Sequence, residues 1–453
     1  MGRYAVVGGG FSGVAATHYL QQAGHEVALF ERDPDVGGRS QSALLGDTRV
    51  TFGGKNIGRH YTYFRAFTAA MGHNPYEFFG INSSRVEDGE IKTLDSTKKR
   101  QSVMAFARRA PKRDVLRFAA LAALVRADER NRFLGSAAFA RISARYDSRP
   151  LSSYFSPLVC ERLLRTLSVR MNGAEPDEVW PGNFGSNMGT LLDTYDQLTL
   201  GLGRVFEQFR SRTDVRTDSP VGALLRDGGR VTGVSITEGP HAGEHEFDGV
   251  VLAMPSAAAG ALLRPADEPL ADLLGRPRYH PGAVVIARYD RPIFSEEIRA
   301  LVFDASEPVS NAGAYGVEQR HIVRYTFSGR AAREELRRAA GAEELLERAE
   351  ANLDRWFPVA AAERLDFVSR RWDDAYCAYT PYHHRFRAEL RARLARHPGV
   401  ELAGDYLRGV SIEACFRSAR DAVDATLAAG SSSAGSARPS SQARRAVAVS
   451  SRS

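Results

Sequence analysis

The start of the chain combines two hydrophobic patterns. Residues 4–7 (YAVV) form an uninterrupted apolar run, which is typical of a strand buried on both faces. Apolar residues then recur at helical spacing from Val14 to Leu20, and Gly24 follows as a helix stop. The segment EVALFE at 26–31 predicts a second strand. This strand–helix–strand order predicts an α/β fold.

Three later segments extend the picture. The stretch HPGAVVIARYDRPIF at 280–294 predicts a long strand that ends at Pro292. The run VLRFAALAALV at 115–125 predicts a helix that faces the core. Residues 431–453 are of low complexity and carry no acidic residue, so we expect them to be a disordered tail.

Glycines mark the turn between the first strand and the first helix. Gly8, Gly10 and Gly13 form the pattern G-x-G-x-x-G. In such a motif the glycines permit a tight turn, close approach of the backbone to a pyrophosphate, and close packing of helix on strand. The helix that begins near Phe11 and Ser12 then offers free N–H groups to the pyrophosphate. The pattern predicts a dinucleotide-binding site.

A carboxylate stands at the end of the second predicted strand. Glu31 lies 18 residues after Gly13, where a carboxylate can accept hydrogen bonds from both ribose hydroxyls of a dinucleotide. The same charge repels the 2′-phosphate of NADP. Arg32 follows directly, and we expect it to contact the cofactor as well. NAD and FAD enzymes share all of these features.

Four further segments distinguish an FAD-binding protein from an NAD-binding one. They are GGR at 37–39, the loop TFGGKNIG at 51–58, the stretch SPVGALLRDGGRVTGVSI at 219–236, and VELAGD at 400–405, after which a helix starts near Ser411. In this order they resemble the flavin amine oxidase, protoporphyrinogen oxidase and phytoene desaturase superfamily. The resemblance implies that the dinucleotide is FAD.

The resemblance also implies a role for each segment. Arg39 would lie by the phosphate and the ring, Asp405 would reach the ribityl and phosphate region, and Val221 would meet the adenine through its backbone. The amides after Ser411 would point at the flavin ring, where the helix dipole favours negative charge. The predicted cofactor-binding residues are Gly8, Gly10, Phe11, Ser12, Gly13, Glu31, Arg32, Gly38, Arg39, Gly53, Gly54, Val221, Gly404, Asp405, Ser411 and Ile412.

The fold implied by the resemblance is a Rossmann-like FAD-binding domain interleaved with a mixed α+β substrate domain. We expect residues 1–80, 205–265 and 396–430 to form the FAD-binding domain. Residues 81–204 and 266–395 would form the substrate domain, with the catalytic surface where the two meet.

Candidate catalytic residues lie in the ring-side loop and in the aromatic turn RRWDDAYCAYTPYHH at 370–384. Lys55 either binds an anionic substrate or the flavin carbonyl, or is a solvated surface lysine. Tyr376 and Tyr379 would pack over the flavin. His383 either transfers protons or is exposed in its turn. No metal is expected.

Three positions depart from the family pattern. Thr51 stands where many relatives have aspartate, Val284 aligns with the lysine that amine oxidases place near flavin N5, and Ser411 replaces a cage tyrosine. The last two departures shift the expected reaction toward carbon–carbon desaturation or ring oxidation. The polar stretch at 168–180, with Arg170, either lines the substrate pocket or starts a helix.

Cys377 lies in the aromatic turn, where some monoamine oxidases of the superfamily attach FAD through a cysteine. The desaturase pattern of the turn fits Cys377 in place of a proline and puts the turn over the reactive face of the ring. A thioether requires the sulfur at the dimethylbenzene edge instead. We therefore expect non-covalent FAD and treat Cys377 as a small buried hydrophobe.

Charge and composition limit the partners. The net charge is +7, but four arginines lie in the final segment from 431, so the rest of the chain carries +3. The basic stretch at 92–117 is either a solvated loop or a surface for membranes or anionic substrates, and no nucleic-acid motif accompanies it. Three distant cysteines form no disulfide framework, and no signal peptide or transmembrane run is evident, so a cytoplasmic protein is expected.

The sequence therefore supports three functional hypotheses. The first is an FAD-dependent oxidoreductase that removes hydride from a small or medium metabolite, by carbon–carbon desaturation or carbon–nitrogen oxidation, with O₂ as acceptor. The second is a desaturase or isomerase that handles an apolar substrate at a membrane surface. The third is a redox-silent FAD-binding scaffold. The substrate identity and the oligomeric state stay open.

Overall fold

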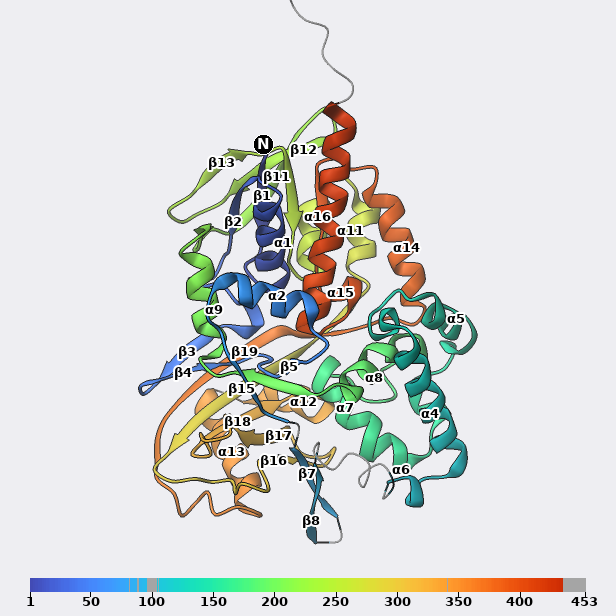
Figure 1. The fold of residues 1–453 in the computed structure, drawn as a ribbon, viewed down its shortest axis with the longest axis vertical. Helices are drawn as coiled ribbons and strands as arrows, with labels where there is room; N and C mark the ends of the chain where they lie inside the picture. Colours follow the sequence, from blue (N-terminus) through green and yellow to red (C-terminus); the bar gives the residue numbers. More distant parts are fainter. Residues whose placement is uncertain (81, 88, 96–103, 105, 340, 435–453) are drawn as a thin grey trace, which may run out of the picture.

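The computed structural model describes residues 1–434 except 81, 88, 96–103, 105 and 340 (Figure 1). A parallel sheet forms its upper part, with the strand order β10–β2–β1–β14–β20. These strands are β1 (Arg3–Val7), β2 (Glu26–Phe30), β10 (Asp214–Arg216), β14 (Gly249–Leu252) and β20 (Val400–Leu402). Segments from both ends of the chain therefore lie in one sheet.

Helices cover both faces of this sheet. On one face, α1 (Phe11–Gln22) packs against the long helix α16 (Ile412–Ala434), and α2 (Thr62–Met71) and α9 (Gly201–Arg210) extend the same core. On the other face lie α10 (Ser256–Leu263), α11 (Glu268–Leu274), α14 (His383–Leu394), and the sheet of β11 (Val221–Asp227), β12 (Arg230–Ile236) and β13 (Gly243–Glu246). The predicted first strand, helix and second strand are confirmed to within a few residues.

A second, seven-stranded sheet forms the lower part, in the order β19–β15–β18–β17–β16–β7–β8. Its strands are β7 (Asn82–Glu87), β8 (Glu90–Asp95), β15 (Arg278–Tyr289), β16 (Ala300–Val302), β17 (Val309–Ala314), β18 (Ile322–Phe327) and β19 (Arg364–Ala378). The pairing is antiparallel except between β7 and β16. Helices α12 (Arg330–Arg338) and α13 (Ala342–Asp354) cover it.

A helical block flanks the second sheet and has its own core. It contains α4 (Lys112–Ala127), α5 (Ala137–Tyr146), α6 (Pro157–Val159), α7 (Arg165–Asn172) and α8 (Phe184–Leu192). Short strands connect the two parts: β3 (Ser42–Leu45) pairs with β4 (Thr48–Thr51), and β9 (Tyr195–Leu198) pairs with β5 (Ile57–Gly58) and β6 (Tyr76–Phe78). The expected mixed α/β fold with a parallel sheet and a second, mixed substrate-side sheet is confirmed.

Two predicted boundaries are wrong. β15 ends at Tyr289 rather than Pro292, because the Asp290 side chain accepts the N–H of Glu363 at 2.9 Å in place of a backbone carbonyl. α16 continues through residues 431–434, which the sequence assigned to a disordered tail. Extending an existing helix adds one hydrogen bond for each residue fixed, so even a serine-rich end can be helical. Residues 435–453 of the predicted tail lie outside the described part of the chain.

The buried carboxylate of Glu413 joins α16 to the start of α2. It accepts hydrogen bonds at 3.1 Å from the backbone N–H groups of Tyr63 and Phe64 and from the Thr62 hydroxyl. Arg417 pairs with the same carboxylate at 3.1 Å. Glu413 is fully buried, so water cannot replace it as the acceptor for these N–H groups. Its carboxylate therefore caps the N-terminus of α2 from a neighbouring helix.

Replacing Glu413 tests this junction. We expect Glu413→Ala to lower the free energy of unfolding by about 3 kcal/mol, because it leaves the buried N–H groups of Tyr63 and Phe64 without an acceptor. Arg417 would lose one of its two carboxylate partners and keep Glu129. Asp424→Ala, which removes the partner of Arg420 further along the same helix, is the matched control and should change stability by less than about 0.5 kcal/mol. Denaturant unfolding measures both, and equal midpoints for the two variants would contradict the assignment.

Candidate functional site

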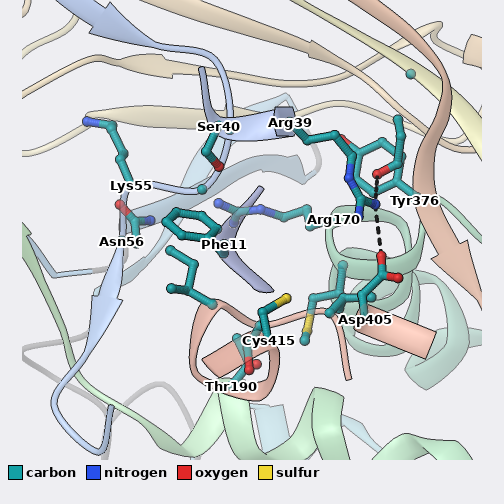
Figure 2. A pocket seen from close by; sticks show the side chains of 18 of the residues that line it. Phe11, Arg39, Ser40, Lys55, Asn56, Arg170, Thr190, Tyr376, Asp405 and Cys415 are labelled. Atoms are coloured by element: carbon teal, nitrogen blue, oxygen red, sulfur yellow. Dashed lines mark hydrogen bonds and ion pairs between the residues drawn. The ribbon is translucent and has the colours of Figure 1, made fainter. Parts of the chain in front are cut away.

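A cavity of about 1360 Å³ runs between the parallel sheet and the seven-stranded sheet (Figure 2). It begins beside Glu31 and the loop after β14, passes the glycine turn after β1, and ends among α4, α7 and β18. Sites for a single drug-sized ligand usually measure roughly 300–1,000 Å³. This cavity therefore has room for a large cofactor together with a second molecule.

The three predicted glycines of the first turn have three different surroundings. Gly8 has a φ of +103°, which glycine adopts readily. A Cβ atom added at Gly13 would lie 1.8 Å from the Gly8 carbonyl oxygen, so this glycine allows the helix to pack on the strand. A Cβ at Gly10 would meet no protein atom within 4 Å, because Gly10 borders the cavity. The space at Gly10 fits a pyrophosphate.

Glu31 lines the cavity at the end of β2 and is 7% exposed. Its carboxylate accepts hydrogen bonds from the backbone N–H groups of Gly9, at 2.5 Å, and Asp33, at 2.9 Å. Burial raises the pKa of Glu31, and these two donors oppose that rise. Arg32, which also lines the cavity, points its side chain largely into solvent.

An ion pair joins the second glycine segment to the C-terminal segment. Arg39 contacts the carboxylate of Asp405 at 2.8 Å and donates a hydrogen bond to the Ala375 carbonyl at 3.0 Å (Figure 2). Tyr279 donates a further hydrogen bond to Asp405 at 2.7 Å. Burial alone would lower the pKa of Arg39, but the charge of Asp405 outweighs it and raises that pKa.

The start of α16 also borders the cavity, through Ser411, Ile412 and Cys415. The Ser411 hydroxyl caps the helix by accepting the N–H of Ala414 at 3.1 Å. The N–H groups of Ile412 and Glu413 have no acceptor among the residues that the structure describes. Together with the helix dipole, they form a site for an anionic or carbonyl group.

Of the predicted cofactor-binding residues, Gly13 alone does not line the cavity, since its part is in packing. The structure thus brings the others together, from Gly8 in the first turn to Ile412 in the last helix. Gly53 and Gly54 form the part of the wall that leads to Lys55.

Lys55 is not a solvated surface lysine. Its ammonium lies between the rings of Phe79, at 4.4 Å, and Tyr315, at 4.3 Å, and donates to the Gln197 side chain at 3.3 Å. Burial, with added repulsion from Arg324 and Arg299, lowers the pKa of Lys55 to about 7. Lys55 and Asn56, from the ring-side loop, both line the cavity (Figure 2).

The aromatic turn does not face the cavity as a whole. Tyr376 lines it, and its phenol lies near Arg324, Arg170 and Arg39. Tyr379 instead donates to the backbone carbonyl of Asp405 at 3.3 Å and belongs to the core behind the parallel sheet.

His383 also lies in this region, where its Nε2 is 2.8 Å from the Tyr406 carbonyl oxygen. Burial lowers the pKa of His383 to about 3 and keeps it neutral. The structure therefore does not bring Tyr379 or His383 to the cavity. Of the predicted catalytic residues, it places Lys55 and Tyr376 there.

One of two cysteines near the site lies in the core, and the other lines the cavity. Cys377 is fully buried in the core behind the parallel sheet and is not part of the cavity wall. Cys415 lines the cavity, which the sequence did not indicate.

Residues that the sequence did not single out complete the far end of the cavity. Arg299, the residue before β16, and Arg324 of β18 line it together with Arg170 of α7. Of the polar stretch at 168–180, Arg170 reaches the cavity, whereas Glu175 pairs with Arg165 at 3.0 Å. The sequence offered Arg170 as a possible pocket residue. Arg299 and Arg324 join it only through proximity in the fold, so no sequence pattern could reveal those two.

An apolar chamber adjoins these cations. Its wall is the inner side of α4, the helix that the sequence predicted to face the core. We define the apolar chamber by Val115, Phe118, Ala122, Leu163, Leu167 and Met171.

In the described residues, no helix is long and apolar enough to cross a membrane. The same part of the chain contains no group of three or more His, Cys, Asp or Glu residues placed to hold a metal ion.

Comparison with known proteins agrees with this architecture. The cyclohexylamine oxidase from Brevibacterium oxydans IH-35A matches with a TM-score of 0.69 and 19% identity, over 95% of this chain and 99% of that one. Wild-type putrescine oxidase bound to putrescine matches with a TM-score of 0.71 and 18% identity, over 94% and 99%. A fatty acid isomerase from P. acnes, which produces CLA, matches with a TM-score of 0.65 and 16% identity, over 94% and 98%.

At these identities the structural matches establish the fold. The family follows from the sequence match, because residues 11–427 match the flavin containing amine oxidoreductases. The chain therefore belongs to the flavin-containing amine oxidoreductase family and is an FAD-dependent oxidoreductase.

Proposed function

We propose that this enzyme binds FAD non-covalently along the cavity and oxidises a carbon–carbon bond of a medium-sized substrate held in the cavity beyond it. The open space at Gly10 and the free amides at the start of α16 are suited to a pyrophosphate and to a flavin ring, respectively. The interleaved domain division predicted from the sequence is part of this proposal, because the cavity would then lie between the two domains.

Bound FAD supplies hydride acceptance. The chain's own task is to hold the substrate's reacting carbon in place and to exclude water. Oxidation removes a hydride and a proton from the substrate, and O₂ as the final acceptor takes up the two electrons and two protons as H₂O₂. Tyr376 and Val284 form walls at the point where the seven-stranded sheet meets the cavity.

The charge of the cavity is the observation that favours carbon–carbon over amine oxidation. Lys55, Arg170 and Arg324 line the end that a substrate would occupy. An ammonium substrate would be repelled by these cations. Val284, at the position of the usual amine-oxidase lysine, is an apolar wall residue.

The apolar chamber supports a second candidate, an isomerase or desaturase that takes an apolar substrate from a membrane surface. The outer side of α4, which walls this chamber, exposes Lys112, Arg113, Leu116 and Arg117. Basic residues around an exposed leucine are suited to an anionic lipid surface. One of the solved structures with this fold is a fatty acid isomerase.

Anaerobic titration of the purified flavoprotein tests the proposed reaction. We expect alkyl or cyclic substrates with an oxidisable carbon–carbon bond to bleach the flavin absorbance, and air to restore it with formation of H₂O₂. Faster bleaching by primary amines would reject the proposal. Turnover without net bleaching or H₂O₂ would favour the isomerase, and vesicle binding would place it at a membrane. A flavin that no compound reduces would support the redox-silent scaffold.

Substitutions at two glycines test the cofactor's position. Gly10→Val should abolish FAD binding without changing the fold, because the added side chain enters only the cavity and Gly10 has an extended backbone at a φ of −72°. Gly13→Val should instead disrupt the fold through its clash with Gly8. Flavin content and circular dichroism separate the two effects, and normal FAD content in Gly10→Val would contradict the placement.

Acid precipitation tests the absence of a covalent link. We expect all yellow colour in the supernatant, because Cys377 lies in the core rather than in the cavity wall. Cys377→Ala and Cys415→Ala should retain FAD. A yellow pellet that becomes white in Cys415→Ala would identify a thioether at the cysteine that lines the cavity, and the same result in Cys377→Ala would show that the turn reaches the flavin.

A further inference from the structure

Buried arginines at the far end of the cavity have neutral partners. Arg170 donates to the Ser83 hydroxyl at 3.1 Å, and Arg324 donates to the Phe52 carbonyl at 2.6 Å. The Nε of Arg324 is buried and makes no hydrogen bond in the described structure. Each guanidinium therefore retains donor capacity beside the cavity.

The described part of the chain supplies no counterion to either arginine. Within the described residues, no carboxylate lies within ion-pair distance of Arg170 or Arg324. Burial lowers the pKa of both groups, and the charge of Arg324 lowers that of Arg170 further. Lys55 adds a third positive charge, which Arg324 repels. Because like charges at a buried site are unfavourable, this arrangement calls for an anion.

Two other arginines that line the cavity are paired within the protein. Arg39 contacts Asp405 at 2.8 Å, and Arg162, near the apolar chamber, contacts Glu87 at 2.7 Å. By contrast, Arg170 and Arg324 lack an ion-pair partner among the described residues, and Arg324 lies near both Arg170 and Lys55.

The neighbouring surface indicates what carries the anion. Leu167 and Met171 of the apolar chamber are three residues before and one residue after Arg170, and all three line the cavity from α7. A ligand that reaches both regions has a charged head and an apolar body. The flat, forked guanidinium group matches a carboxylate, which accepts two parallel hydrogen bonds.

We infer that Arg170 and Arg324 bind the carboxylate of the substrate, that Lys55 adds charge beside it, and that the apolar chamber holds the hydrocarbon body. This inference rests on the proposed function for the reaction but concerns binding alone. The substrate class is then an apolar carboxylic acid. Arg170, Arg324 and Lys55 act as binding residues.

Calorimetry on the FAD-loaded enzyme, together with perturbation of the flavin absorbance, tests the site. The probes are decanoate, decanamide, decylamine and decyl phosphate. We expect decanoate to bind at least tenfold more tightly than decanamide, and decylamine to bind more weakly still. Equal binding of decanoate and decanamide would overturn the inference, and tighter binding of decyl phosphate would overturn the assignment to a carboxylate.

Variants locate the anion. Arg170→Gln and Arg324→Gln should each weaken decanoate binding at least tenfold while FAD content and decanamide binding stay unchanged. Arg204→Gln, at an exposed arginine of α9, is the matched control. The decanoate affinity of Arg324→Lys should lie between those of the wild type and Arg324→Gln, because lysine keeps the charge but cannot donate two parallel hydrogen bonds. If one variant does not fold, the other and the probe series decide. Unchanged decanoate binding in a folded Arg170→Gln or Arg324→Gln variant would overturn the site.

The pH dependence provides a further readout. The groups that face Lys55 are Arg324, Arg299, Glu77 and the two aromatic rings. Because the pKa of Lys55 is about 7, its positive charge is present below that pH and is lost as the pH rises. Decanoate affinity should therefore fall between pH 6 and pH 9, and Lys55→Met should flatten the profile.

The outcomes also separate this inference from the proposed function. A flavin that no substrate reduces would reject the oxidoreductase proposal, while selective decanoate binding would still support the carboxylate site. Conversely, an active oxidase that does not distinguish decanoate from decanamide would reject the site alone.

Discussion

The ion pair between Arg39 and Asp405 holds together the two halves of the site. The two residues follow β2 and β20, which are separated by two strands of the parallel sheet but end at the same edge. Arg39 also bonds to Ala375 of β19, and Asp405 accepts a hydrogen bond from Tyr279 of β15. This one pair therefore fixes the edge of the parallel sheet against the second sheet, and the cavity is the space between them.

The same geometry explains what the sequence could predict. The roles of Gly8 and Gly13 depend on contacts within one turn and its neighbouring strand, so a short pattern was enough. The family resemblance of the aromatic turn predicts Tyr379 over the flavin and offers His383 as either a proton-transfer residue or an exposed one. However, β19 ends at Ala378, and contacts with Asp405 and Tyr406 draw the next residues into the core. Such contacts between distant segments leave no local pattern.

Charged side chains show this limit most clearly. A lysine in a glycine-rich loop is usually solvated, and Lys55 is buried only because Phe79 and Tyr315, from other parts of the chain, enclose it. Likewise, Arg165 and Arg170 occupy one helix, yet Arg165 meets Glu175 whereas Arg170 meets no carboxylate among the described residues. Whether an arginine of this helix is ion-paired therefore depends on tertiary packing rather than on its sequence position.

The distribution of charge along the cavity suggests that the cofactor and the proposed substrate would be bound by different interactions. At the glycine turn, backbone N–H groups and a helix N-terminus can hold a pyrophosphate, and the nearby Arg39 is already neutralised by Asp405. The unpaired positive charge lies instead at the far end. A carboxylate bound there keeps its charge when a carbon–carbon bond is oxidised, so substrate and product would be held equally well. Such uniform binding positions the substrate and lowers KM without accelerating the chemical step. In this proposal the rate would come from the bound flavin and from how the apolar chamber aligns the reacting carbon against it.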